Sequence, residues 1–220
     1  MYNDWDGVGE LVTLPDQAAH RVVDKIVLAT SANNSHIKTA IVCPPTIYGP
    51  GRGPDNQRSA QAYKGANCIL QRKKGFVPGK GKNIWHQVHV QDLSELYLLL
   101  GEAAVSGGGK ATWNEQGYYL AENGSFAWGD IFKQITKIAH KKGFIPSDEC
   151  PSLEASELNS IIPHGAAAWG TNSRGVSQRG KILLGWNPVR RGLMEELPDI
   201  VEGEAKALGL IQGHAAKVTQ

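Results

Sequence analysis

The chain has 220 residues, of which 23 are Lys or Arg and 21 are Asp or Glu, so its formal net charge is +2. This length suffices for one large or two small domains, and the balanced charge argues against a protein that binds nucleic acid phosphates. No apolar run approaches the length that spans a bilayer, and the acidic start is unlike a signal peptide. The three cysteines fit neither a disulfide framework nor a zinc site. A soluble, cytoplasmic globular protein without a metal is expected.

The first predicted helix covers residues 15–32. Pro15 suits the first helical position, and Val22, Val23 and residues 26–28 form an apolar stripe. Residues 38–43 are apolar at their end, which is typical of a buried parallel strand. Pro44-Pro45 must end that strand, because proline cannot donate to the ladder.

A Gly/Pro-rich loop over 46–54 precedes a predicted helix over 57–73. Residues 84–90 are predicted to form a strand, with Asp92 as the N-cap of a helix over 93–104. An extended segment is expected over 112–120. Further helices are predicted over 126–142, 152–161, 176–184 and 193–208. This order indicates an α/β fold with too few strands for a complete doubly wound sheet.

Several residue clusters have an ordinary structural interpretation. The glycines at 49–53 and 107–109 lack the spacing and the strand–turn–helix context of a phosphate-binding loop. His86 and His89 lie three apart on a strand and would face opposite sides, which disfavours a shared metal. Arg21 and Lys25 share a helix face, and two like charges side by side are typical of a solvated surface.

Taken in order, four segments resemble one family. They are residues 40–51 (AIVCPPTIYGPG), residues 88–93 (VHVQDL), Asn114, and residues 183–188 (LLGWNP). They are similar to segments of the extended short-chain dehydrogenase/reductases, the NAD-dependent epimerase/dehydratases, and are closest to fungal members. The resemblance runs from about residue 15 to residue 208. It implies a truncated Rossmann-like parallel sheet, of which this chain holds the C-terminal strands, and a mostly helical substrate-domain portion.

The chain also departs from the family pattern. The opening strand–G-x-x-G-x-x-G–helix is absent from this sequence, and with it roughly 100 residues of the dinucleotide half. Lys25 matches the lysine of the family's Y-x-x-x-K, but Arg21 stands at the tyrosine position. An arginine stays protonated near neutral pH and cannot replace a proton-transferring tyrosine. Trp85 falls where nucleotide-sugar epimerases place an arginine for the substrate diphosphate.

The resemblance implies a set of site residues and the cofactor NAD or NADP. Lys25 would hold the nicotinamide ribose, and His20 or Arg21 would lie near the chemistry. The remaining residues are Pro44, Ile47, Tyr48 and Gly49 for the cofactor, and Arg58, His86 and Arg174 for the substrate.

Two functions follow from these observations. One is an NAD(P)-dependent oxidoreductase or epimerase that acts on a small molecule. The other is a dinucleotide-sensing or regulatory relative that has lost the chemistry, which the missing tyrosine favours; a fragment without an independent role is a third reading. Residues 1–55 would be the remnant of the dinucleotide-binding half and residues 56–220 the substrate portion, with some elements returning to the first half. A homodimer is an open alternative to a monomer.

Overall fold

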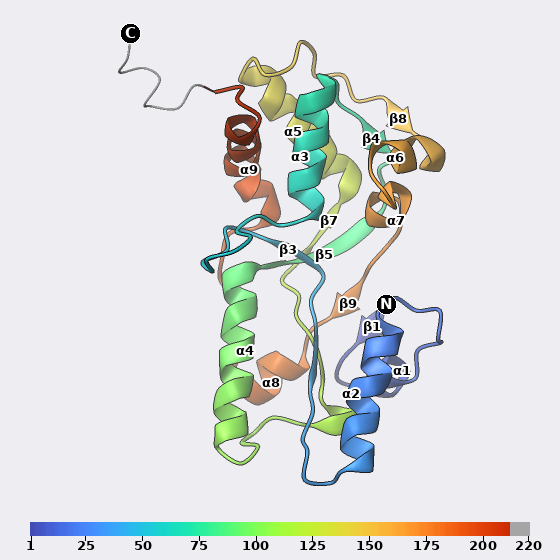
Figure 1. The fold of residues 1–220 in the computed structure, drawn as a ribbon, viewed down its shortest axis with the longest axis vertical. Helices are drawn as coiled ribbons and strands as arrows, with labels where there is room; N and C mark the ends of the chain where they lie inside the picture. The colour runs from blue at the N-terminus through green and yellow to red at the C-terminus, as the bar shows by residue number, and fades with distance from the viewer. Residues whose placement is uncertain (212–220) are drawn as a thin grey trace. The chain divides into compact units, whose positions relative to one another are not determined.

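Short strands joined by helices make up residues 1–211, the part of the chain that the computed structural model describes (Figure 1). In chain order the elements are β1 (Tyr2–Asn3), α1 (Val8–Val12), α2 (Arg21–Asn33), β2 (Ile41–Cys43), β3 (Thr46–Tyr48), α3 (Gln61–Arg72), β4 (Val77–Pro78), β5 (Ile84–His89), α4 (Val90–Val105), the 3₁₀ helix η1 (Asn114–Gln116), β6 (Tyr118–Leu120), β7 (Ser125–Ala127), α5 (Trp128–Lys141), β8 (Ser152–Leu153), α6 (Ala155–Ile161), α7 (Gly165–Trp169), β9 (Gly175–Val176), α8 (Arg179–Leu184) and α9 (Leu193–Ala207).

The chain folds into two compact units, each built from separated segments. Unit 1 contains Met1–Pro45, His86–Gly124 and Arg174–Arg190. Unit 2 contains Thr46–Trp85, Ser125–Ser173 and the described residues from Arg191. The boundary therefore runs through β5. This mixed α/β arrangement confirms the predicted fold class.

Unit 1 contains the predicted parallel strand. β2 pairs in parallel with β6, with Ile41 opposite Tyr118 and Cys43 opposite Leu120. It ends at Cys43, as the two following prolines require. The strand is shorter than predicted and half-buried rather than buried, since β6 is its one strand neighbour within its sheet.

One face of this strand pair forms a small hydrophobic core with α1, a helix that the sequence reading missed. Val8 and Leu11 of α1 pack against Tyr118 and Leu120 of β6. The N-terminal segment is fixed nearby by Asp4, which is fully buried. Its carboxylate accepts hydrogen bonds from the backbone N–H groups of Gln178 (2.7 Å), Arg179 (3.1 Å) and Leu120 (2.9 Å). Burial raises the pKa of the Asp4 carboxyl, while these hydrogen bonds oppose the rise.

The predicted cap of α4 is wrong. α4 begins at Val90, and its N-cap is His89, whose Nδ1 accepts a hydrogen bond from the Gln91 N–H (3.1 Å). Asp92 lies within the first turn of α4, is fully buried, and accepts from the backbone N–H groups of Val189 (3.3 Å) and Arg190 (3.1 Å). The Asp92 carboxylate therefore accepts hydrogen bonds from a segment far along the chain, and it does not cap the N-terminus of α4.

α2 also begins later than predicted. His20 has φ = 64° and caps the helix in a left-handed conformation, so residues 15–20 form turns instead of helix. Part of the predicted apolar stripe does not pack: Val22, Val23 and Ile26 are all exposed.

Unit 2 contains the larger hydrophobic core, formed where α3, α5 and α9 pack together. Aromatic rings fill its centre, with Phe132 in tilted or edge contact with Phe76, Trp128 and Trp169. Trp128 and Trp169 are fully buried and belong to this core. Within residues 1–211 no helix combines the length and the apolar character needed to cross a bilayer.

Candidate functional site

The helix residues predicted to lie near the chemistry have different surroundings. Arg21 is half-buried, and its Nη2 donates to the backbone oxygen of Val12 (2.8 Å). Its Nε and Nη1 are buried and have no hydrogen-bond partner among the described residues. His20 is exposed at the start of α2. The structure thus brings Arg21, not His20, toward the interior of unit 1.

Asp24 is the acidic residue that accompanies Arg21. It lies on the same helix, and its exposed fraction is 7%. Burial raises the pKa of the Asp24 carboxyl, and the charges of Arg21 and His20 together with the Tyr118 hydroxyl oppose the rise. A half-buried cation and a buried acid therefore lie three residues apart at the start of α2.

Cys43 and Tyr118 complete this cluster. Burial raises the pKa of the Cys43 thiol, and the nearby charge of Asp24 raises it further. Burial likewise raises the pKa of the Tyr118 hydroxyl, and Cys43 and Asp24 add to the effect. A thiol with a raised pKa is a poor nucleophile at neutral pH, so Cys43 is a structural residue of this cluster.

Lys25 points to solvent and pairs with Asp16. Its Nζ lies 3.0 Å from Asp16 Oδ1, and the two side chains are 53% and 71% exposed. An exposed pair of this kind contributes at most about 1 kcal/mol, so the ammonium is free to change partners.

The carboxyl ends of β2 and β6 meet at one edge of unit 1. The Ala121 N–H donates to the oxygen of Cys43 (3.1 Å), which continues the strand pairing to the point where Pro44 follows. Glu122 comes next, and its Oε2 lies 3.6 Å from Nδ1 of His86. In open α/β sheets this edge is where ligands bind.

Unit 2 contains Ile47, Tyr48 and Gly49. Tyr48 is almost fully buried, and its hydroxyl donates to the oxygen of Arg191 (2.9 Å). Gly49 has φ = 89°, a conformation that favours glycine. The side chain of Ile47 is half-buried.

The two arginines predicted as anion contacts differ in availability. Arg58 forms an ion pair with Glu204 of α9, a carboxylate that is 1% exposed and also accepts from Asn67 Nδ2 (2.9 Å). Its guanidinium therefore already has an anionic partner. Arg174 is exposed, and its backbone oxygen accepts from the Tyr2 N–H (3.3 Å) beside β9.

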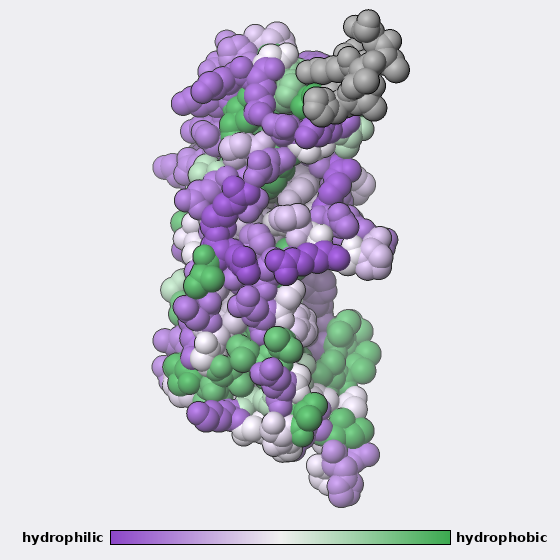
Figure 2. All heavy atoms as spheres, turned by 90° about the vertical axis from the view of Figure 1, so that its left-hand side faces the viewer, coloured by the Kyte–Doolittle hydropathy of each residue, from purple (hydrophilic) through white to green (hydrophobic). Residues whose placement is uncertain are grey.

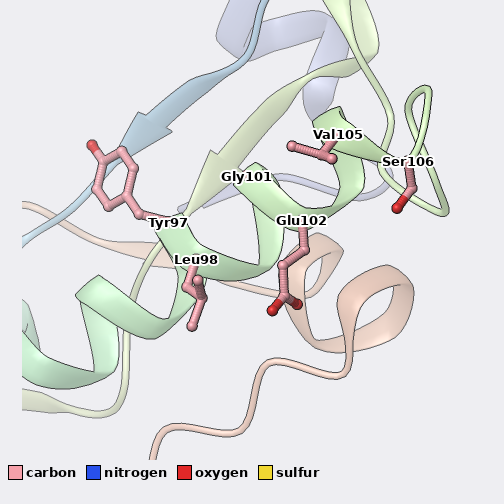
Figure 3. Close-up of a pocket in the computed structure, with 6 residues that line it drawn as sticks. All are labelled: Tyr97, Leu98, Gly101, Glu102, Val105 and Ser106. Atoms are coloured by element: carbon pink, nitrogen blue, oxygen red, sulfur yellow. The ribbon is translucent and has the colours of Figure 1, made fainter.

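A hollow of about 720 Å³ lies on the outer face of α4 (Figure 3). Figure 2 shows apolar side chains gathered over this face. The hollow offers one carboxylate, Glu102, and two hydroxyls, those of Tyr97 and Ser106, and all of its lining residues come from a single helix and its C-cap. It therefore lacks the converging polar groups of a ligand site, and none of the residues predicted from the sequence lines it.

Sequence reasoning missed Glu122 and Asp24. Glu122 had a usable signal, because an ionisable residue directly after a short apolar strand lies at the ligand edge of a parallel sheet. Asp24 had none, since one acidic residue on a helix is ordinarily exposed. Among residues 1–211, no three His, Cys, Asp or Glu side chains are arranged to hold a metal ion.

Comparison with known proteins gives a consistent family. Residues 17–114 match the NAD dependent epimerase/dehydratase family. The chain is 33% identical over 218 residues to the oxidase ucsJ of an Acremonium species, covering 96% of this chain and 63% of that protein.

Solved structures of the same architecture are similar to it. UDP-glucose 4-epimerase of Thermotoga maritima, solved with UDP-glucose, has a TM-score of 0.57 and 19% identity over 86% of this chain and 52% of that one. dTDP-glucose 4,6-dehydratase of Bacillus anthracis, in complex with NAD, has a TM-score of 0.58 and 15% identity over 88% and 54%. The chain thus spans about half to three fifths of the proteins it matches, and at these identities the structures show the fold.

Proposed function

Because residues 17–114 match the NAD dependent epimerase/dehydratase family and the chain is 33% identical to an oxidase over 96% of its length, we propose that it belongs to this family and serves an NAD(P)-dependent oxidoreductase or epimerase that acts on a small molecule. The observation that carries the proposal is the parallel pair β2–β6, with Pro44, His86 and Glu122 at its carboxyl edge. A parallel sheet leaves backbone and polar side chains at this edge available to a ligand.

The residues present suit one end of the dinucleotide. Lys25 is exposed and weakly paired, so its ammonium can donate to ribose hydroxyls. Gly49, Gly51 and Gly53 lie between β3 and α3, but the sequence contains neither G-x-G-x-x-G nor G-x-x-G-x-x-G for the pyrophosphate. When bound, the nicotinamide accepts or gives a hydride; the chain's own residues hold the ribose and the substrate.

We propose a substrate without a diphosphate group. Trp85 lies at the position where the resemblance expects an arginine. Its indole N–H donates to the oxygen of Thr171 (2.7 Å), and its ring meets Trp128 edge-on at 6.2 Å. A neutral ring committed to such contacts provides no charge for a diphosphate. The substrate roles of Arg58, His86 and Arg174, and a division of function at residue 55, remain predictions.

Arg21 favours the second function, a dinucleotide sensor. Its guanidinium can orient or stabilise an oxyanion, but it does not move a proton near neutral pH. A relative with Arg21 at the tyrosine position and no other proton-transfer residue would bind a dinucleotide without turnover.

Ligand-observed NMR with the full chain tests the proposal. Saturation transferred from the protein to NADH should be larger at the nicotinamide protons than at the adenine protons. Lys25→Ala should reduce the transfer several-fold, whereas Lys110→Ala, an exposed lysine in a loop of unit 1, should leave it unchanged. Transfer confined to the adenine, or equal in both variants, would contradict the proposal.

A further inference from the structure

Glu122 lies at the centre of a set of hydrogen-bond donors in unit 1. Its Oε1 accepts from the Ser177 N–H (3.0 Å), and its Oε2 accepts from the Gly124 N–H (3.1 Å). The Nζ of Lys181 lies 3.7 Å from Oε1. Two backbone N–H groups donate hydrogen bonds to the carboxylate and the Lys181 ammonium forms an ion pair with it, so the carboxylate acts as an acceptor and is held in one orientation.

His86 faces this carboxylate. Its Nδ1 lies 3.6 Å from Glu122 Oε2, and each side chain is 13% exposed. The Nδ1 atom itself is buried and forms no hydrogen bond within the described residues. A carboxylate that only accepts favours the proton on Nδ1, and a neutral imidazole then has its lone pair on Nε2. Because Nδ1 is buried, the exposed fraction of His86 belongs to the rest of its side chain.

The position of the pair suits a ligand. Glu122 follows β6 by two residues, at the carboxyl edge of the parallel pair β2–β6. Imidazole is the side chain best suited to moving protons near neutral pH, and Arg21 at the tyrosine position cannot do so.

We propose that His86 is the proton-transfer residue of this edge and that Glu122 is its positioning residue. This inference rests on the proposed function for its ligand, a small molecule with a hydroxyl group. The ligand O–H bond breaks, its oxygen keeps the electron pair, and the proton bonds to Nε2 of His86. The Nδ1–H of the resulting imidazolium stays directed at the ionised carboxylate of Glu122. The reverse step returns the proton to the ligand oxygen.

Nitrogen NMR of the ¹⁵N-labelled full chain tests the positioning. The long-range ¹H–¹⁵N correlations of His86, assigned with a His86→Gln variant, should show Nδ1 protonated and Nε2 bare at pH 8. Glu122→Gln should shift the tautomer ratio about tenfold toward Nε2–H, because a charged acceptor is lost. Glu115→Gln, which changes an exposed carboxylate of η1 in the same unit, should leave the ratio unchanged. A wild-type Nε2–H tautomer, or a ratio unaffected by Glu122→Gln, would overturn the proposal.

Chemical modification tests access to Nε2. Diethyl pyrocarbonate reacts with bare imidazole nitrogens, and mass spectrometry locates the product. His86 should react several-fold faster than His89, which is 6% exposed. Equal or slower reaction of His86 would show that its free nitrogen is closed to ligands and would refute the proposal. Neither experiment uses a cofactor, so a failure of NADH to bind would contradict the proposed function without altering these results.

Discussion

Asp92 and Arg190 lie 98 positions apart in the chain and are joined through the Asp92 carboxylate, which accepts the Arg190 backbone N–H at 3.1 Å. The guanidinium Nε of Arg190 also lies 3.9 Å from the same carboxylate, and the neighbouring Val189 N–H donates to it at 3.3 Å. One buried acid inside α4 therefore fixes the segment between α8 and α9.

Asp92→Asn should destabilise the protein by about 1–3 kcal/mol, because an amide NH₂ would face a buried backbone N–H. Urea unfolding followed by circular dichroism measures the change. Glu95→Gln is the matched control: Glu95 faces the same Arg190 at 3.7 Å but is 49% exposed, so its loss should cost less than about 1 kcal/mol. Equal losses in the two variants would show that Asp92 does not fix this segment.

Much of unit 1 could be predicted locally. The apolar run of residues 38–43 and the two prolines after it indicated β2 and its end, and the structure confirms both the strand and its parallel pairing. The cap of α4 could not be predicted, because residue preference favours Asp92 while its real partners come from Val189 and Arg190, far along the chain. β1 and β9 are two residues each, too short to leave a periodic signal.

The candidate site was only partly predictable, because its residues also come together through contacts between distant segments of the chain. The resemblance pointed to His86, but its approach to Glu122 depends on how β5 and the segment after β6 are brought together. Arg21 is half-buried and Lys25 is exposed although they lie one turn apart on α2, and the contact of Arg21 with Val12 comes from a segment outside the helix.

Asp24→Asn tests how the buried carboxyl in the first turn of α2 affects stability. Burial raises the pKa of Asp24, so the carboxyl binds its proton more tightly in the folded chain than in the unfolded chain. Its contribution to stability is therefore greatest at low pH and is lost as pH rises through the folded pKa. Because asparagine does not titrate, the stability of the variant relative to wild type should increase from about pH 4 to pH 7.

Denaturant unfolding at several pH values measures that difference. Asp16→Asn changes an exposed acid in the segment before α2 and should show a much smaller pH-dependent difference. A decrease in the relative stability of the Asp24 variant over this range would show that the Arg21 charge outweighs burial.

Arg58→Ala should cost about 1–3 kcal/mol, because Glu204 is 1% exposed and would keep only Asn67 as a donor. Lys142→Ala removes the cation of the exposed Lys142–Glu202 pair in the same unit and should destabilise the protein much less than Arg58→Ala does. Thermal or urea unfolding distinguishes the two. If Arg58→Ala is as stable as wild type, the Arg58 guanidinium is available to a ligand.

Gly129→Ala tests the close approach of the start of α5 to residue 81. A Cβ at Gly129 would lie 2.5 Å from the oxygen and 2.7 Å from the Cα of Gly81, both backbone atoms. Such overpacking should destabilise unit 2 by about 1–3 kcal/mol. A Cβ at Gly203 in α9 would have no atom within 4 Å, so Gly203→Ala should stabilise the protein by about 0.5–1 kcal/mol. A Gly129 variant as stable as wild type would contradict this packing.

Calorimetric titration of the 220-residue chain with NADH, and with reduced nicotinamide mononucleotide, tests the central claim most directly. Lys25 suits the nicotinamide ribose, whereas the sequence contains neither G-x-G-x-x-G nor G-x-x-G-x-x-G for the pyrophosphate. Both ligands should therefore bind with a Kd of about 1 mM or weaker, within about threefold of each other. A micromolar Kd for NADH that the mononucleotide does not approach would contradict the account.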